Sequence, residues 1–389
     1  MSKIKDITGK MIFSFFSLFP LKNVVVGSSF YGKRYENNPR FVFEKLEEKY
    51  PNIKKTWICR NKELCNLPQY VKPICGKIQG IYTLATAKVI IDSHFVPIYF
   101  KKRKGQLAIF MYHGGIGIKR NSNEVSARKK TDTPKNNADN MSFFISNSSF
   151  MNRVIRGSLE YKGPILKCGY PKDDPLFEEQ LGHKEVVCRF YDIPFENHLV
   201  LYAPTYRQDI NDYSGFCINL QETCKALSER FGGDWIAIVK WHPNQKINIT
   251  KTKEMYGPNV IDATAYGNMQ ELIIASDAFI SDYSSCIFEA AERKIPCFSF
   301  ATDWEVFKNE QGFHFEIDSL PFPYCSSNDE LVSSILNFDN QKYLFELDEF
   351  MKQEGLEESG RASEIIADII NEFISGNTDV INTLEYEGE

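Results

Sequence analysis

The fold is decided by one stretch, residues 279–303, which reads FISDYSSCIFEAAERKIPCFSFATD. It opens with the apolar pair Phe279–Ile280, which favours a strand, and breaks at the polar turn Ser281–Ser285. Apolar residues then recur at helical spacing from Ile287 to Ala291, and a second apolar run follows at residues 295–300. Strand, turn, helix and strand make a βαβ unit, whose parallel strands require an α/β domain.

The polar turn has a chemistry of its own. It brings two hydroxyl groups, those of Ser284 and Ser285, to the N-terminus of the predicted helix. Unpaired backbone N–H groups and the helix dipole favour an anion there, most often a phosphate. The turn is equally consistent with a serine that caps the helix without a ligand, with Glu289 exposed to solvent on the first turns.

Composition bounds the class of protein. The chain has 389 residues, of which 43% are hydrophobic, enough for two or three domains with buried cores. A net charge of −5 argues against nucleic acid as the main partner. Its ten cysteines are scattered without a CxxC pair, which indicates reduced thiols and a cytoplasmic protein.

The N-terminus resembles a signal peptide only in part. An apolar run at residues 11–19 follows Lys3, Lys5 and Lys10. No small-residue cleavage site comes after it, and the run is too short to span a bilayer. One interpretation is a helix packed into the core. We favour the other, a basic amphipathic helix at the membrane interface, which the basic cluster at residues 101–104 could help to hold. This predicts a peripheral protein at the inner face of the cell membrane.

Strand and helix patterns alternate twice along the chain. We expect a membrane-associating segment at residues 1–22, a doubly wound domain at residues 23–185 and a second one at residues 186–376. The acidic tail, residues 377–389, is expected to fray.

In the first domain, a predicted strand at residues 107–112 ends at a histidine and two glycines. In open α/β sheets ligands bind at the carboxyl ends of strands, and His113 in that position could take a proton near neutral pH. Gly114 and Gly115 would let a substrate approach the backbone. The alternative is a glycine-rich turn with an incidental histidine; we favour the functional interpretation.

In the second domain, Arg207 stands just past the strand at residues 198–202, where its guanidinium would suit phosphate oxygens. By itself it would be read as a surface arginine. His242 follows the strand at residues 235–240. The remaining histidines have no comparable setting and are assigned structural or surface roles: His94, His183, His198 and His314.

Four separated motifs resemble one family. Met111–Lys119 is similar to WHGTPLKK, Tyr202–Arg207 to YAPTWR, Lys240–Pro243 to (K/R)xHP, and Ser281–Ser285 is SDYSS. In order and spacing they resemble the CDP-glycerol glycerophosphotransferase family of teichoic-acid and capsule synthesis. The chain departs from the pattern mainly at residues 114–117, GGIG in place of GTPL, which puts the identity of the acceptor in doubt.

The resemblance implies a GT-B architecture of two Rossmann-like domains facing across a cleft. It implies transfer of a polyol phosphate from CDP-glycerol or CDP-ribitol to a hydroxyl of a lipid-linked or saccharide acceptor, with release of CMP. We expect no cofactor and no metal, because no HExxH, DxD or Cys/His cluster of metal spacing occurs.

The resemblance also implies roles for residues. His113 corresponds to the proposed base and His242 to the histidine at the donor phosphates. Arg207, Ser284 and Ser285 would cradle the pyrophosphate. Asp282 would orient the loop or a hydroxyl, and Glu289 would hold ribose hydroxyls. The matched motifs complete the substrate-binding set with Gly114, Gly115, Lys119 and Thr205.

Two other functions compete. A GT-B glycosyltransferase using a nucleotide sugar would share the donor site but has no need of the histidine–glycine loop. A non-catalytic nucleotide- or polymer-binding protein would need no base, so the presence of both His113 and His242 argues against it.

Overall fold

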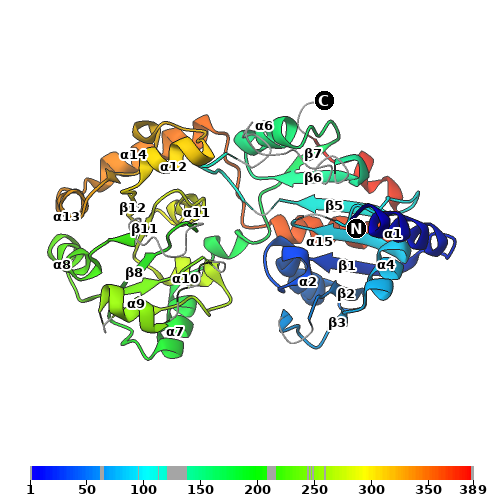
Figure 1. Ribbon diagram of the computed structural model, residues 1–389, viewed down its shortest axis with the longest axis horizontal. Helices are drawn as coiled ribbons and strands as arrows, with labels where there is room; N and C mark the ends of the chain where they lie inside the picture. The colour runs from blue at the N-terminus through cyan, green and yellow to red at the C-terminus, as the bar shows by residue number, and fades with distance from the viewer. Residues whose placement is uncertain are drawn as a thin grey trace. The chain divides into compact units, whose positions relative to one another are not determined.

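The computed structural model describes residues 2–61, 65–94, 96–112, 114–120, 138–207, 216–242, 245, 247, 249–257 and 260–386, which form two compact α/β units (Figure 1). Of these, the residues up to 115 together with 138–174 and 356–386 form the N-terminal unit. Residues 116–120 and the described part of 175–355 form the C-terminal unit.

The N-terminal unit is built on a parallel sheet in the order β3-β2-β1-β4-β5-β6-β7. Its central strands are continuous apolar runs, as expected for a parallel sheet covered on both faces; every residue of β5 is buried. The strands are β1 (Lys22–Ser28), β2 (Lys54–Ile58), β3 (Val71–Ile74), β4 (Ala87–Asp92), β5 (Leu107–Met111), β6 (Phe143–Ser146) and β7 (Ile165–Lys167).

Local sequence signals begin the helices of this unit. Asn37 caps α2 ahead of a proline in its first turn, and the Ser148 hydroxyl accepts the Met151 N–H at the start of α6. The helices are α1 (Ser2–Phe16), α2 (Asn38–Lys49), α4 (Lys77–Thr86), α6 (Ser149–Ser158) and α15 (Ala362–Ser375), with 3₁₀ turns η1 (Phe30–Gly32), η2 (Asp174–Phe177) and η5 (Thr378–Asn382).

The C-terminal unit repeats the plan with the parallel order β10-β9-β8-β11-β12-β13. The strands are β8 (His198–Tyr202), β9 (Trp235–Val239), β10 (Ile261–Asp262), β11 (Ala278–Ser281), β12 (Cys297–Phe300) and β13 (Tyr324–Cys325). The helices are α7 (Gln180–Tyr191), α8 (Leu220–Phe231), α9 (Ile249–Tyr256), α10 (Met269–Ala275), α11 (Cys286–Glu292), α12 (Trp304–Gln311), α13 (Asn328–Leu336) and α14 (Asn340–Gln353), with the 3₁₀ turn η4 (Ile317–Ser319).

The βαβ unit predicted at residues 279–303 is present as β11, α11 and β12. The two strands pair in parallel, with Phe279 opposite Cys297 and Ser281 opposite Ser299. All ten cysteines are free, in agreement with their scattered positions in the sequence.

The units divide the chain differently from the expected boundaries at 185 and 376. Residues 175–185 belong to the C-terminal unit, where Lys184 pairs with Asp277 at 3.2 Å. Residues 116–120 also belong there, because the His314 N–H donates to the Ile118 carbonyl at 2.8 Å.

Helix α15 returns to the N-terminal unit, although it lies near the end of the chain; it lies beside α2 and β4, and Figure 1 shows it next to α2. Asp174 accepts the first backbone N–H groups of this helix, from Ala362 at 2.8 Å and from Ser363 at 2.7 Å. The described part of the segment expected to fray packs on the N-terminal unit, where the Tyr386 ring lies 5.9 Å from that of Phe143.

Helix α1 has one packed side and one exposed side. One side packs on the N-terminal unit: Phe13 is buried against Phe100, with ring centroids 5.8 Å apart, and a Cβ at Gly9 would come within 2.8 Å of the Tyr99 ring. The other side leaves large apolar side chains exposed, namely Ile7, Met11 and Phe15, with Leu18 just beyond the helix. None of the helices among the described residues has both the length and the apolar character needed to cross a bilayer.

Candidate active site

The C-terminal sheet reverses its direction of growth between β8 and β11. From β8 the chain continues to β9 and β10 on one side, and from β11 to β12 and β13 on the other. No connection covers the carboxyl ends of the two strands at such a reversal, which is where open α/β sheets bind ligands. Thr205 and Arg207 follow β8, and Asp282 to Ser285 follow β11, so these candidates meet at this edge.

Asp282 joins the two strand ends. It is 1% exposed, and its carboxylate accepts the Thr205 N–H at 2.9 Å and an Nη2–H of Arg207 at 2.8 Å. It also accepts the N–H of the next residue, Tyr283. The Asp282 carboxylate therefore holds the turn after β8 against the turn after β11.

The Arg207 guanidinium is also largely occupied by protein groups. Besides Asp282, it donates to both oxygens of Asp303, at 2.8 and 3.0 Å, and to the Thr205 carbonyl at 2.9 Å. These bonds leave one of its five N–H donors for a ligand. The guanidinium also lies 4.8 Å from the Phe307 ring centroid. Burial alone would lower the pKa of Arg207, but the carboxylates of Asp282 and Asp303 outweigh it and raise the pKa.

The sequence suggested that the Arg207 side chain would be free to bind a phosphate, and the structure differs. The charge of Arg207 is balanced inside the protein, and its main contacts orient the Thr205 turn. Asp303, at the end of β12, and Tyr283, whose hydroxyl donates to Asp303 at 2.7 Å, complete this network. Sequence reasoning missed both roles, although Asp303 carries the same signal as the others, a polar residue just past a strand.

Lys119 supplies a second positive charge, which makes fewer contacts with protein groups than the guanidinium of Arg207 does. Its Nζ lies 3.4 Å from the Thr205 hydroxyl and 5.9 Å from the Phe307 ring centroid, and no carboxylate among the described residues comes within 4 Å of it. Burial lowers its pKa, with Asp282 acting in the opposite direction and Arg207 adding to the lowering. Although it belongs to the histidine–glycine motif, Lys119 lies in the C-terminal unit.

The serine turn opens α11, as predicted. Ser285 is the N-cap residue but makes no side-chain cap bond, and Ser284 accepts from the Cys286 thiol at 3.0 Å. Both serines are partly exposed. Glu289 is buried at 9% exposure and accepts from the Gln270 amide at 3.0 Å, so the alternative of a solvated Glu289 is wrong.

His242 follows β9, next to β8 in the sheet, and is exposed. Its ring lies 5.5 Å from that of Tyr206. The two residues before it are fixed to the unit: the Lys240 amine donates to the Tyr266 carbonyl at 2.6 Å, and the Trp241 indole donates to the Thr252 hydroxyl at 2.9 Å. His242 thus projects from a rigid support at the same carboxyl edge as Arg207.

His113 lies outside the described residues, but the structure shows how the chain around it is held. The buried Asn38 amide donates to the Tyr112 carbonyl at 2.7 Å and accepts the Lys172 N–H at 2.9 Å. On the other side, a Cβ at Gly115 would come within 2.9 Å of the Asn147 amide. A Cβ at Gly114 would lie 3.9 Å from the Tyr112 ring. Sequence reasoning missed Asn38 because its role depends on a partner more than seventy residues away.

Lys172 is buried beside Asn38. Its amine pairs with the Asp173 carboxylate at 2.7 Å, and the two side chains are 3% and 1% exposed. Glu358 accepts the Tyr170 N–H nearby at 3.0 Å, and burial together with the Asp173 charge raises the pKa of Glu358. This ion pair supports the loop after β7 and not a ligand directly.

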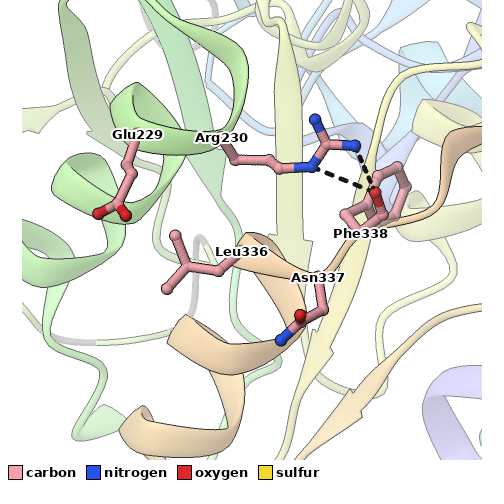
Figure 2. Close-up of a pocket in the computed structure, with 5 residues that line it drawn as sticks. All are labelled: Glu229, Arg230, Leu336, Asn337 and Phe338. Carbon is pink, nitrogen blue, oxygen red and sulfur yellow. Dashed lines mark hydrogen bonds between the residues drawn. The ribbon is translucent and has the colours of Figure 1, made fainter.

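An open hollow elsewhere in the C-terminal unit has no part in this chemistry. Figure 2 shows it between the end of α8 and the end of α13, with two Arg230 donors bonded to the Phe338 carbonyl. No candidate residue lines it.

Comparison with known proteins shows which family the chain resembles over most of its length. The family model described as CDP-Glycerol:Poly(glycerophosphate) glycerophosphotransferase matches residues 11–372. The chain is 26% identical to the teichoic acid poly(glycerol phosphate) polymerase of Staphylococcus epidermidis, over 90% of this chain and 50% of that protein. It is 25% identical to the teichoic acid ribitol-phosphate primase of Bacillus spizizenii, over 97% of this chain and 98% of that one.

The fold has close relatives among solved structures. The wall teichoic acid polymerase TagF matches with a TM-score of 0.82 and 23% identity, covering 96% of both chains. This likeness confirms the expected fold class, two doubly wound domains of the GT-B type. The chain spans about half the length of the first curated relatives that it matches.

Proposed function

Because the chain belongs to the CDP-glycerol:poly(glycerophosphate) glycerophosphotransferase family, we propose that it transfers a polyol phosphate from CDP-glycerol or CDP-ribitol to an acceptor hydroxyl in surface-polymer synthesis. The resemblance inferred from the four motifs is confirmed by the family match. The observation that carries the proposal is the meeting of Lys119, Thr205 and the Ser284–Ser285 turn at the reversal of the C-terminal sheet.

In this reaction the acceptor oxygen attacks the β-phosphorus of the CDP-polyol. A new P–O bond forms, the bond to the bridging oxygen breaks, and CMP leaves with the electron pair. The reaction needs a base for the acceptor proton and cations or N–H donors for the phosphate oxygens. We assign the base to His113, on its match to the family motif and its place directly after β5.

The donor phosphates are assigned to the C-terminal unit. Lys119 supplies the cation that is not already neutralised by a carboxylate, and Ser284 and Ser285 supply hydroxyl donors. Arg207 and Asp282 hold together the turns that carry Thr205 and the two serines. We assign His242 to the same phosphates, since β9 ends beside β8, and Glu289 to the ribose hydroxyls. The expectation of a site without metal or cofactor stays a prediction.

We propose that the acceptor is lipid-linked or saccharide and that α1 brings the protein to the membrane surface. The exposed apolar side chains of α1 lie on a helix docked beside Phe100, which directly precedes the basic cluster at residues 101–104. Lys101 and Lys104 in that cluster are exposed, as binding to an anionic leaflet requires.

The histidines provide the decisive experiment. Purified protein is incubated with an acceptor and with CDP-glycerol, CDP-ribitol or a UDP-sugar, and release of CMP or UDP is measured. We expect His113→Ala to lose about 10²–10⁴-fold in turnover while binding the CDP-polyol normally, because a base acts in the transition state. His242→Ala should weaken donor binding as well.

Calorimetric titration of the CDP-polyol into both variants separates the two roles. UDP release from a UDP-sugar, with no CMP release from either CDP-polyol, would replace this proposal with the nucleotide-sugar glycosyltransferase. Wild-type turnover in His113→Ala would remove the base assignment alone.

A further inference from the structure

The turn after β8, which carries Thr205 and Arg207, lies between the ends of two neighbouring strands. In the sheet, β8 pairs with β11 on one side and with β9 on the other. The Asp282 carboxylate, just past the end of β11, accepts the Thr205 N–H at 2.9 Å. This bond fastens the turn on the β11 side. A different residue, Gln245, fastens it on the β9 side.

Gln245 lies three residues beyond His242 in the chain, and it is 5% exposed. Its side-chain oxygen accepts the Arg207 N–H at 3.1 Å. Because a backbone N–H can only donate, this bond requires the oxygen of the amide, and not its nitrogen, to face the turn. The N–H groups of Thr205 and Arg207 are thus both taken by buried side chains, one from each neighbouring strand end.

The backbone of Gln245 makes the other half of this connection. Its N–H donates to the His242 carbonyl at 2.8 Å, so the glutamine is bonded to the histidine by its main chain and to Arg207 by its side chain. The strand end before His242 is itself attached to β8, because the Lys240 N–H donates to the Tyr202 carbonyl at 2.9 Å. Gln245 therefore links the loop of His242 to the turn that carries Arg207.

A neutral acceptor suits this position. The guanidinium of Arg207 is already balanced by the carboxylates of Asp282 and Asp303. A third buried carboxylate would add an uncompensated negative charge beside a site that is proposed to bind phosphate, which is itself an anion. The amide of Gln245 supplies the oxygen that the Arg207 N–H needs without adding that charge.

We propose that Gln245 is a positioning residue of the donor site, which holds His242 in place against the turn after β8. In this role the side chain acts through His242 and not on the substrate itself. The His242 ring lies 5.5 Å from the ring of Tyr206 in that turn, and the bond between Gln245 and Arg207 keeps the loop and the turn together. The inference rests on the proposed function for the identity of the ligand that His242 binds.

The test removes the bond and keeps the bulk of the side chain. Gln245→Met has nearly the length of glutamine but no oxygen to accept the Arg207 N–H. We expect the Kd for the CDP-polyol to rise about 3- to 10-fold, the equivalent of one hydrogen bond. Gln245→Asn, which shortens the reach of the amide by one methylene, is a second variant and should show the same loss.

Gln106→Met is the matched control. Gln106 is a glutamine of the N-terminal unit, 4% exposed, whose side chain also bonds to the backbone, at the Leu84 and Ala87 carbonyls. It directly precedes β5, at the amino end of that strand. Its replacement should lower the thermal midpoint at least as much as Gln245→Met does, yet leave the affinity for the CDP-polyol at the wild-type value. An equal loss of affinity in the control would overturn the proposal, because stability alone would then explain it.

A double-mutant cycle tests whether Gln245 acts through His242. If it does, adding Gln245→Met to His242→Ala should change the affinity for the CDP-polyol by less than about twofold, because the histidine that Gln245 positions is already absent. Losses of affinity that multiply in the double variant would contradict this role.

The imidazole NMR signals of His242, identified by their absence from His242→Ala, give a readout that needs no substrate. We expect these signals to shift in both Gln245 variants and to keep their positions in Gln106→Met. Unchanged signals together with an unchanged affinity for the CDP-polyol would overturn the proposal. Shifted signals in a protein that binds neither CDP-polyol would support the positioning role and reject the proposed function instead.

Discussion

At the scale of single residues, the two cations beside the Thr205 turn have different tasks. Arg207 is 9% exposed and balanced by two carboxylates, whereas Lys119 is partly exposed with no carboxylate within 4 Å among the described residues. A cation whose charge is already neutralised gains little from a phosphate, so the proposal assigns the donor phosphates to Lys119 and not to Arg207.

This difference predicts that two alanine substitutions change different quantities, the free energy of unfolding in one and the affinity for the donor in the other. Arg207→Ala leaves Asp282 and Asp303 without their partner and should lower the free energy of unfolding by about 3–5 kcal/mol. Lys119→Ala should leave it within about 0.5 kcal/mol but weaken CDP-polyol binding roughly tenfold or more. Urea unfolding and calorimetry measure the two quantities. If Arg207→Ala unfolds like wild type and loses only donor affinity, Arg207 is a phosphate ligand after all.

At the scale of elements, α1 has one side packed on the protein and one exposed apolar side. Gly9 and Phe13 face the N-terminal unit, while Ile7, Met11 and Phe15 recur four residues apart on an exposed stripe. This exposed stripe is the feature on which the proposed binding in the plane of a membrane interface rests.

The stripe makes the membrane proposal testable without removing the helix. Met11→Glu combined with Phe15→Glu should abolish flotation with vesicles that contain anionic lipid, because charged side chains replace the apolar contact. Phe345→Glu, at an exposed apolar position on α14 of the C-terminal unit, is the control, since it adds the same charge outside α1. Equal flotation of the double variant and wild type would mean that α1 is only a packed helix.

The turn before α11 (residues 286–292) keeps two serine side chains at the surface of the unit. The seven-residue α11 follows directly on the strand–turn predicted from the sequence, and its Ser284–Ser285 turn stays partly exposed because Asp282 and Tyr283 take the buried positions. The carboxylate of Asp282 supports the turn, so the hydroxyls beside it remain available.

At the scale of the whole molecule, the last helix completes the first unit. Six side chains of α15 belong to the core of the N-terminal unit, and Lys49 on α2 pairs with Asp368 at 2.6 Å. The N-terminal fold therefore depends on residues that are synthesised after the entire C-terminal unit.

A core substitution in α15 should reveal this dependence. Ile370→Ala removes a side chain that is 0% exposed and should cost about 2–5 kcal/mol. Hydrogen exchange should accelerate in β1 and α2 of the N-terminal unit, while β8 and β11 keep their protection. Val306→Ala, on the exposed side of α12, should change neither region. Faster exchange confined to β8 and β11 would contradict the assignment of α15.

Much of this protein could be predicted from local patterns. Apolar runs mark the buried parallel strands, and the residues that follow them, from Arg207 to the Ser281–Ser285 turn, mark the carboxyl edge where ligands bind. Periodicity and strand-end position are properties of neighbouring residues, so the sequence carries them without reference to the rest of the chain.

Only the tertiary structure decided which residues share a partner. Pairing across the sheet brings Asp303 and Asp282 to one arginine, and Asn38 to the carbonyl of Tyr112. It also joins Gln245 to the backbone of Arg207. It assigns Lys119 to one unit and α15 to the other. Contacts between residues so far apart in the sequence depend on strand order and burial, which no local pattern specifies.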